Sequence, residues 1–465
     1  MRIRIFGQYL QLSIAVLTVS EAFAFFGAFT LVAGPPFYSV SIAQIEGPIW
    51  PRATLFSLAM IVSLLAFGLY SARQRARMIG MVVRICAAVV TGLVVVSLVF
   101  YVVWPHMSIG RSVPLMAAAV VLGALAVSRV TFGRIVDENL FKRRVIVYGC
   151  GKNAAPIAKL RRRSDRRGFH LLGFVTPPDE MRSVPAELLL DSPSSLSDLC
   201  LRVGADEVVV AMDDRRRSFP ILEMLECRLA GIEVTELLTF LERETGRVRI
   251  DVLNPSWIIF GGGFRRDTLR LFSSRMLDLT ASSLILLVTL PLILLTALAI
   301  KVEEGWRAPV LYAQKRVGLG GRPFNVLKFR SMRQDAEGDG QARWATKGDA
   351  RVTRVGAFIR KCRIDELPQI LCVLQGHMSF VGPRPERPEF VAELAQKIPY
   401  YVQRHCVKPG ITGWAQLCYP YGSSEQDALE KLQYDLYYIK NNTLLFDLAI
   451  LLQTVEVVVM GQGAR

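Results

Sequence analysis

The sequence is short of the residues from which metal cages and disulfide frameworks are built. It has only four histidines, at positions 106, 170, 377 and 405, and their spacing does not match that of metal ligands. Its eight cysteines are scattered and include no Cys-x-x-Cys pair. These absences argue against a structural zinc site and against a disulfide-stabilised secreted domain, so a reducing compartment is expected. His377 and His405 are interpreted as packing or polar-contact residues.

Acidic side chains are also scarce relative to basic ones. The 465 residues include 56 Lys and Arg against 40 Asp and Glu, which gives a formal net charge of +16, and 52% of the residues are hydrophobic. A chain this long and this apolar is expected to be neither a single domain nor purely soluble. The excess positive charge is expected to favour anionic membrane lipids and phosphorylated ligands rather than nucleic acid.

Four long apolar stretches lie in the N-terminal region, at about residues 10–33, 53–70, 79–104 and 112–132. Each is long enough to cross a hydrocarbon core about 30 Å thick as a helix. The first carries Glu21 and lacks a small-residue cleavage pattern, so it is expected to remain as a membrane segment. Basic residues before the first stretch and after the second and fourth place both ends of a four-helix transmembrane bundle, residues 1–140, in the cytoplasm. For Glu21 and Arg84 a structural pair or an interface position is preferred to a lipid or substrate contact.

Short strands and helices alternate over residues 141–255, which predicts a Rossmann-like cytoplasmic α/β domain. Val145-Ile-Val-Tyr-Gly-Cys-Gly-Lys-Asn-Ala154 has the pattern of a buried strand, a glycine turn and a helix start. Glu207-Val-Val-Val-Ala211 has the pattern of a later parallel strand. The turn is similar to a nucleotide-binding loop, but Ala154 replaces the third glycine. Two roles stay open: nucleotide binding and, preferred, a scaffold or oligomerisation domain.

A fifth apolar run, residues 276–300, follows a predicted linker at 256–275. At about 1.5 Å per residue a helix of this length spans a bilayer. A full crossing would place the basic segment that follows on the side of the membrane opposite the α/β domain. Pro291 lies within the run, where it would remove a backbone hydrogen bond and bend the helix. We therefore predict a re-entrant membrane helix with its break at Pro291, and a spanning helix with a tolerated proline is the alternative.

An adjacent pair of carboxylates, Asp365 and Glu366, follows in the sequence Asp-Glu-Leu-Pro-Gln. Pro368 favours the first turn of a helix, so the pair is expected at or just before a helix N-terminus, which stabilises ionised carboxylates. Two such groups can bind a divalent metal through one oxygen and leave another for attack on phosphorus or for proton transfer. Taken alone, the same residues would also fit a helix N-cap followed by a first-turn glutamate.

Four sequence strings surround or contain this pair, in the order Phe324-Asn-Val-Leu-Lys-Phe-Arg-Ser-Met332, Asp365-Glu-Leu-Pro-Gln369, Val381-Gly-Pro-Arg-Pro385 and Pro409-Gly-Ile-Thr-Gly-Trp-Ala-Gln416. With them, residues 275–465 resemble the bacterial sugar transferases, which are monotopic polyprenyl-phosphate glycosyl-1-phosphate transferases. The N-terminal half resembles the extension of the long, exopolysaccharide-associated members. The resemblance implies a C-terminal α/β phosphoglycosyl transferase domain over residues 276–465, on the cytoplasmic face of the bacterial inner membrane.

The resemblance also implies the substrates and the roles of the site residues. Asp365 would attack the β-phosphorus of a UDP-sugar and release UMP, and a polyprenyl phosphate of the undecaprenyl type would then take the sugar phosphate. Glu366 would bind Mg²⁺ or Mn²⁺ together with Asp365, or would accept a proton. The predicted phosphate contacts, whose positive charges pair with phosphate oxygens, are Lys328, Arg330, Arg384 and Arg387.

Two other functions remain open. One is a membrane glycosyltransferase that moves the sugar alone and releases UDP, and the other is a non-enzymatic membrane channel or sensor with a Rossmann-like regulatory domain. The motifs after residue 300 disfavour the second, because a sensor has no need of them together. No single residue in the sequence indicates which sugar is transferred. The apolar stretch at 444–460 predicts a helix that packs on the membrane or on a second subunit, as in a homodimer.

Overall fold

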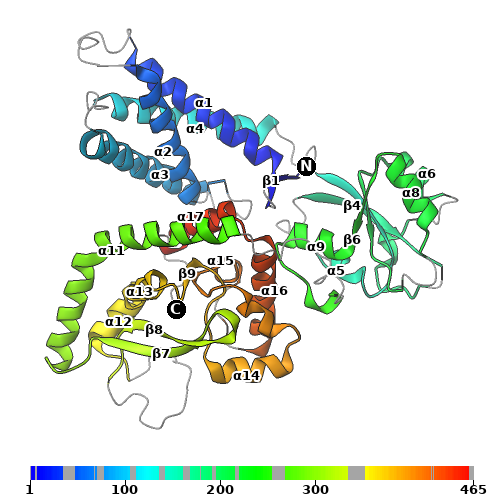
Figure 1. Ribbon diagram of the computed structural model, residues 1–465. Helices are drawn as coiled ribbons and strands as arrows, with labels where there is room; N and C mark the ends of the chain where they lie inside the picture. The colour runs from blue at the N-terminus through cyan, green and yellow to red at the C-terminus, as the bar shows by residue number, and fades with distance from the viewer. Residues whose placement is uncertain are drawn as a thin grey trace. The chain divides into compact units, whose positions relative to one another are not determined.

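The computed structural model describes residues 2–5, 8–34, 48–67, 69–70, 78–104, 112–135, 142–160, 168–178, 180–190, 195–214, 219–253, 268–333, 351–419, 422 and 424–459. Chain contacts divide it into two compact units, Met1–Val252 and Leu253–Arg465 (Figure 1). Most of the predicted linker, residues 256–267, lies outside the described residues.

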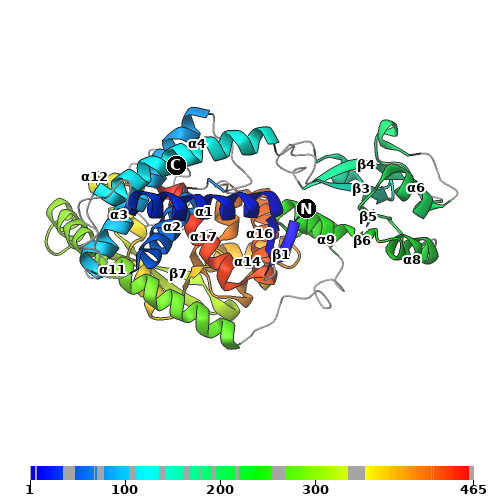
Figure 2. The ribbon, with the colours of Figure 1, turned by 90° about the horizontal axis from the view of Figure 1, so that it is seen from above.

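Four long apolar helices follow a short hairpin of β1 (Arg2–Ile5) and β2 (Gln8–Gln11) in the first unit. Each contains a stretch of 18 to 20 residues that is long and apolar enough to cross a membrane. Helix α1 packs against α2 and α4, and α2 packs against α3 (Figures 1 and 2). The helices are α1 (Leu12–Ala33), α2 (Ile49–Ala66), α3 (Met78–Leu98), which continues as a π-helical segment (Val99–Val103), and α4 (Ser112–Ile135).

A buried polar cluster joins these helices. The Glu21 carboxylate on α1 accepts hydrogen bonds from the hydroxyl groups of Tyr70 and Ser128, and it forms an ion pair with Arg129, at 3.1 Å between Oε1 and Nε. A charge in apolar surroundings is costly unless it is paired and hydrogen-bonded, so these contacts offset the cost of burying the Glu21 carboxylate. The preferred structural role of Glu21 is confirmed, and its partner is Arg129 rather than Arg84.

The rest of the first unit is a four-stranded parallel sheet with the order β4-β3-β5-β6, together with the helices that flank it. Side chains alternate along a strand, so Val145 of β3 packs with α5 and α9, whereas Ile146 packs with α6 and α8. Helices therefore cover both faces of the sheet (Figure 2). The elements are β3 (Arg143–Tyr148), α5 (Ala155–Ala158), β4 (Phe169–Val175), α6 (Leu196–Val203), β5 (Glu207–Val210), α8 (Ile221–Leu229), β6 (Glu233–Glu236) and α9 (Leu237–Thr245).

The glycine turn after β3 is filled by carboxylates of the chain itself. Asp213, just beyond β5, accepts hydrogen bonds from the backbone N–H groups of Lys152 and of the next residue, at 2.9 and 2.8 Å. Glu180 accepts from the N–H groups of Cys150 and Asp213, at 2.8 and 2.7 Å. A Cβ on Gly151 would come within 2.3 Å of Asp213, so the absence of a side chain lets the carboxylate approach. While both carboxylates stay in place, the N–H groups of Cys150, Lys152 and Asn153 are occupied and cannot bind a nucleotide phosphate.

The second unit consists of one long helix, two small two-stranded sheets and several shorter helices. Strands β7 and β8 form an antiparallel hairpin, and β9 and β10 form a parallel pair. The elements are α11 (Thr268–Glu304), β7 (Leu311–Val317), β8 (Pro323–Phe329), α12 (Arg354–Lys361), α13 (Gln369–Leu374), β9 (Ser379–Val381), α14 (Pro388–Lys397), β10 (Gly410–Thr412), α15 (Trp414–Cys418), α16 (Glu425–Asn441) and α17 (Leu444–Val459).

Helix α11 is longer than the predicted run at 276–300, because it begins at Thr268 and ends at Glu304. The helix is bent along its length (Figure 1) and contains Pro291, which cannot donate a backbone hydrogen bond. Two residues earlier, the Thr289 hydroxyl donates to the Ile285 carbonyl at 2.7 Å, a contact that itself tends to bend helices. The bend therefore has two local causes in the sequence.

Helix α17 occupies most of the predicted apolar helix at 444–460. It contacts α11, α15 and both strands of the β9–β10 pair. Phe446 and Ile450 are buried in the second unit. One face of this helix therefore packs on its own unit, and not only on a membrane or on another subunit as predicted.

Candidate active site

A cavity of about 440 Å³ lies in the second unit, between the β7–β8 hairpin, the turn before α13, the loop after β9, and α16. Its lining contains ten Lys and Arg residues against three acidic ones, so it suits a ligand with several negative charges. The acidic lining residues are Asp365, Glu386 and Asp435. The basic ones are Arg316, Lys328, Arg330, Arg333, Arg351, Arg360, Arg384, Arg387, Arg404 and Lys431.

The structure brings the predicted site residues together. Asp365 lines the cavity from the 3₁₀ turn Ile364–Glu366, which ends just before α13, so the predicted place of the pair before a helix start is confirmed. Glu366 lies beside the cavity and is not part of its lining. The four predicted phosphate contacts all line it, two at the end of β8 and two in the loop between β9 and α14.

The backbone before the carboxylate pair explains how Asp365 reaches the cavity. Helix α12 ends at Lys361, and Arg363 adopts a left-handed conformation with φ of 59°. For a residue with a side chain this conformation costs about 1–2 kcal/mol. It reverses the chain, and the 3₁₀ turn that follows presents Asp365 to the cavity. Strain of this kind gathers at functional sites.

Glu366 holds two of the cavity's cations. Lys328 Nζ and Arg384 Nη2 both donate to Glu366 Oε1, at 3.1 and 2.7 Å. Burial disfavours the charged form of Glu366, but Arg384 and Lys328 outweigh this effect and hold its pKa well below its usual range. Burial, followed by the charge of Arg384, lowers the pKa of Lys328. Glu366 therefore remains ionised and fixes both cations.

Asp365 is in the opposite situation. Its carboxylate makes no hydrogen bond to another residue that the structure describes. Burial, and then the charge of Glu366, raise its pKa, with Lys328 in partial opposition. The prediction that the helix start stabilises both ionised carboxylates is therefore wrong for Asp365, because burial and like charge outweigh the favourable neighbours.

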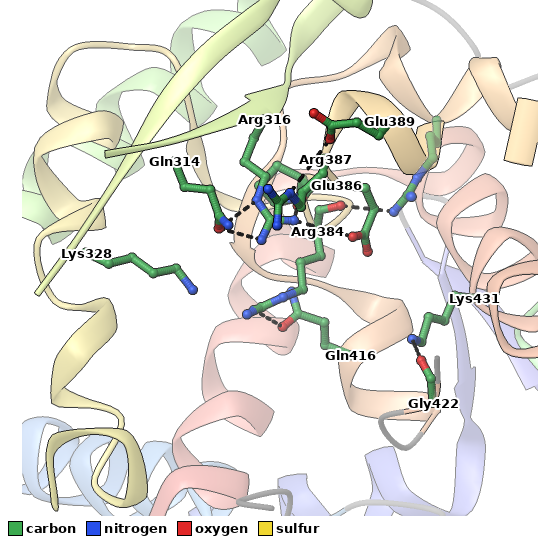
Figure 3. Close-up of polar contacts among 12 residues, drawn as sticks. Gln314, Arg316, Lys328, Arg384, Glu386, Arg387, Glu389, Gln416, Gly422 and Lys431 are labelled. Atoms are coloured by element: carbon green, nitrogen blue, oxygen red, sulfur yellow. Dashed lines mark hydrogen bonds and ion pairs between the residues drawn. The ribbon is translucent and has the colours of Figure 1, made fainter. Parts of the chain in front are cut away.

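Arg384 is held through both its side chain and its backbone. Gln416 Oε1 accepts from Arg384 Nη1 at 3.3 Å, as Figure 3 shows. The buried Arg404 donates to the Arg384 carbonyl at 3.0 Å and pairs with Asp435 at 2.9 Å. Burial raises the pKa of Asp435 to about 6, although Arg404 opposes this shift. These contacts fix the direction in which Arg384 enters the cavity.

Other cations of the cavity are held by neighbouring side chains. Gln314 accepts from Arg316, which also lies 3.5 Å from a Glu386 oxygen, and Arg387 lies 3.7 Å from Glu389 (Figure 3). Arg330 differs from them, because its buried Nε has no hydrogen-bond partner among the residues that the structure describes. A buried donor without a partner is costly, so Arg330 is a group that a bound phosphate would satisfy.

Several charged or polar residues that line this cavity were missing from the prediction. Gln416 closes one of the sequence strings quoted above, and Arg316 alternates with Gln314 on one face of β7, so both had a signal. Other unpredicted lining residues include Arg404, Lys431 and Asp435, and nothing in their own segments indicated a role in the site.

The carboxylate pair fits a magnesium ion that is coordinated partly by the protein and partly by a bound substrate. The described residues contain no group of three or more His, Cys, Asp or Glu side chains that could hold a metal ion. Mg²⁺ is commonly bound through one or two carboxylates together with substrate phosphates. The Asp365 carboxylate and the second oxygen of Glu366 would supply such ligands, whereas a closed zinc-type cage would not fit.

Comparison with known proteins relates the chain to one family. The sequence profile of the bacterial sugar transferases matches residues 269–461. A UDP-N-acetylgalactosamine-undecaprenyl-phosphate N-acetylgalactosaminephosphotransferase of Aeromonas hydrophila is 43% identical over 242 residues, which is 52% of this chain and 56% of that protein.

Two further relatives match over more of the chain. An undecaprenyl-phosphate glucose phosphotransferase of Komagataeibacter xylinus is 33% identical over 69% of this chain and 60% of its own length. A UDP-glucose:undecaprenyl-phosphate glucose-1-phosphate transferase of Xanthomonas campestris pv. campestris is 31% identical over 76% of this chain and 73% of its own length. The chain thus covers less than two thirds of the Aeromonas and Komagataeibacter proteins.

Proposed function

This chain belongs to the bacterial sugar transferase family, and on that premise we propose that it transfers a sugar 1-phosphate from a UDP-sugar to undecaprenyl phosphate and releases UMP. The observation that carries the proposal is the Asp365 carboxylate, which faces a cation-lined cavity without a hydrogen-bond partner among the described residues. The relatives' names supply the acceptor and the type of group transferred.

The reaction would proceed in two displacements at one phosphorus atom. An Asp365 oxygen attacks the β-phosphorus of the donor, and the bond from this phosphorus to the oxygen of UMP breaks, so that UMP leaves with the bonding electrons. An oxygen of undecaprenyl phosphate then attacks the same phosphorus and displaces the Asp365 carboxylate. The product is an undecaprenyl diphosphate sugar, and the enzyme returns to its starting state.

The cavity's cations would stabilise the charge that builds up on the phosphate oxygens. Arg384 is pre-oriented by Glu366 and Gln416, and Arg330 offers an N–H group that no other described residue accepts. Bound Mg²⁺ or Mn²⁺ would neutralise part of the diphosphate charge. The depressed pKa of Glu366 makes it a poor proton acceptor, so its role is to hold Lys328 and Arg384 and to offer its second oxygen to the metal.

The membrane arrangement is part of the proposal. The four N-terminal helices would cross the bacterial inner membrane, and α11 would enter the cytoplasmic leaflet and return at its bend. The Rossmann-like domain and the catalytic unit would then share the cytoplasmic side, where UDP-sugars are found. This layout would place Asp365 where a nucleotide sugar and a lipid phosphate can both reach it.

A donor screen with the purified full-length protein tests the proposal. The relatives' names include both N-acetylgalactosamine and glucose, so UDP-glucose, UDP-galactose and UDP-N-acetylgalactosamine are offered with undecaprenyl phosphate and Mg²⁺. We expect one or more donors to give UMP, only when the lipid is present and not after EDTA treatment. Release of UDP in place of UMP would favour the glycosyltransferase alternative, and no turnover with any donor would favour a non-enzymatic role.

A further inference from the structure

The polar end of α11 is bonded to the strand that leads to Arg384. Asp278 is 3% exposed, and its Oδ1 accepts hydrogen bonds from the Ser379 hydroxyl and from the Phe380 N–H, both at 2.9 Å. Both donors belong to β9, which runs directly into the Gly-Pro-Arg segment that ends at Arg384. A side chain of the long apolar helix thus determines where this strand lies.

The Asp278 carboxylate accepts a hydrogen bond on the edge of β9 that does not pair with β10. Successive N–H groups point to opposite sides of a strand. The Ser379 N–H donates to the Pro409 carbonyl on the β10 side, whereas the Phe380 N–H faces away from β10 and has Asp278 as its acceptor. A buried N–H group needs such a partner, so the carboxylate specifies the position of β9.

Arg275, one turn before Asp278, is bonded to the other half of the active site. Its guanidinium donates to the carbonyls of Val373 and Leu374, at 2.7 and 2.6 Å. These are the last residues of α13, the helix that begins just after the turn carrying Asp365 and Glu366. Residues three apart lie on the same face of a helix, so one face of α11 holds both α13 and β9.

We propose that Arg275 and Asp278 are positioning residues that set the distance between Glu366 and Arg384. Neither lines the cavity, so neither touches a substrate there, and each acts through the element that it bonds. The contact that they maintain is the 2.7 Å bond from Arg384 to Glu366. The helix that would sit in the membrane is therefore also the base on which the two sides of the active site are aligned. The activity readout of this proposal rests on the proposed function.

The test compares Asp278→Ala with two matched variants of the full-length protein. Asp278→Asn keeps an oxygen that can accept both hydrogen bonds. Ser282→Ala removes a buried hydroxyl one turn further along α11, for which the described part of the chain provides no hydrogen-bond partner. We expect Asp278→Ala to lower kcat about 100-fold, as displacement of a catalytic group does. Asp278→Asn should stay within about tenfold of wild type because the bonds are kept, and Ser282→Ala should be unchanged.

A double-mutant cycle separates positioning from general destabilisation. In an Arg384→Lys background, Asp278→Ala should cause much less additional loss than in wild type, because the group that it positions is already altered. Losses that multiply in full, wild-type activity of Asp278→Ala, or failure of the Asn variant to rescue would each overturn the proposal.

Amide hydrogen exchange gives a readout that does not depend on catalysis. Exchange of the peptide covering residues 379–387 should be faster in Asp278→Ala than in wild type and unchanged in Ser282→Ala. If the wild-type enzyme releases no UMP but exchange responds in this way, the proposed function fails and the positioning role stands. Unchanged exchange in Asp278→Ala would overturn the positioning role whatever the activity.

Discussion

Asp365 and Glu366 are neighbours in the sequence, yet Glu366 is bound by Lys328 and Arg384 while Asp365 faces the cavity. The same burial acts on both, but the pKa of Asp365 is raised and that of Glu366 is lowered. Two carboxylates whose pKa values are pushed apart generally have different tasks. Here the geometry separates a group that is available for reaction from a group that holds the cations.

Replacement of Asp365 by Asn should abolish turnover. The amide is nearly isosteric but cannot attack phosphorus as a carboxylate does, so kcat should fall by roughly four orders of magnitude or more. Thermal unfolding should stay close to that of wild type. The control is Glu393→Gln, which removes an exposed carboxylate and should leave kcat unchanged. Near-normal turnover of Asp365→Asn would rule out its role as nucleophile.

Replacement of Glu366 by Gln should impair catalysis and also shift its pH dependence. The variant loses the charge that holds Lys328 and Arg384, so residual kcat should be lower by about 100-fold or more. As the proposed nucleophile, Asp365 must be ionised, so activity should rise with pH through the pKa of that group. Because Glu366 helps to raise the pKa of Asp365, the acid limb of the residual activity should move to lower pH in the variant. An acid limb that stays in place or moves to higher pH would contradict this coupling.

His405 should make the protein less stable in mild acid. It is 9% exposed, and burial followed by the charge of Arg404 lowers its pKa from 6.5 to about 4. Between these values the unfolded chain binds more protons than the folded one, so stability falls as the pH falls from 6.5 towards 4. The loss is at most about 3 kcal/mol.

The measurement is the apparent thermal unfolding midpoint of the full-length protein between pH 7 and pH 4. His405→Leu should flatten its pH dependence, whereas His377→Leu, at an exposed position, should leave it as in wild type. Identical pH dependence in the His405 variant and in wild type would show that this histidine does not contribute.

Cysteine labelling tests whether α11 re-enters or crosses the membrane. Single cysteines replace Leu269 and Trp306, which are 73% and 74% exposed, in a background without native cysteine. With a re-entrant α11, a membrane-impermeant thiol reagent should label both from the cytoplasmic side only. Pro291→Ala should let the helix straighten and move part of the population to a crossing form that lacks activity. Labels on opposite sides in the protein that retains Pro291 would contradict the re-entrant arrangement.

The sequence was sufficient for those parts of the fold and site that are encoded locally. Strands β3 and β5 each contain a run of buried apolar residues, 145–147 and 208–210, and the pair at 365–366 precedes a proline, so both features could be placed from their own segments. The four predicted cations belong to short motifs and all line the cavity. The motifs, through the family resemblance that they carry, were enough to predict that these four side chains belong to one site.

The parts that could not be predicted depend on contacts between distant segments. Arg404 and Asp435 form an ion pair because η8 (Tyr401–Cys406) packs on α16. No sequence feature of either segment predicts this pair. The start of α11 was missed because polar residues such as Arg275 before position 276 have the pattern of a linker. The contacts that Arg275 makes with α13, far away in the sequence, could not be predicted from this segment. Likewise, Asp213 is distant in the sequence from the glycine turn whose N–H groups it binds.

The most direct test of the central claim follows the β-phosphate of the donor. A UDP-sugar labelled with ³²P in this phosphate is incubated with the purified full-length protein, undecaprenyl phosphate and Mg²⁺, and lipid and nucleotide are then separated. If Asp365 takes up a sugar 1-phosphate, the label should appear in the lipid fraction and the nucleotide product should be unlabelled UMP. Label retained in UDP, with unlabelled sugar on the lipid, would contradict phosphoglycosyl transfer.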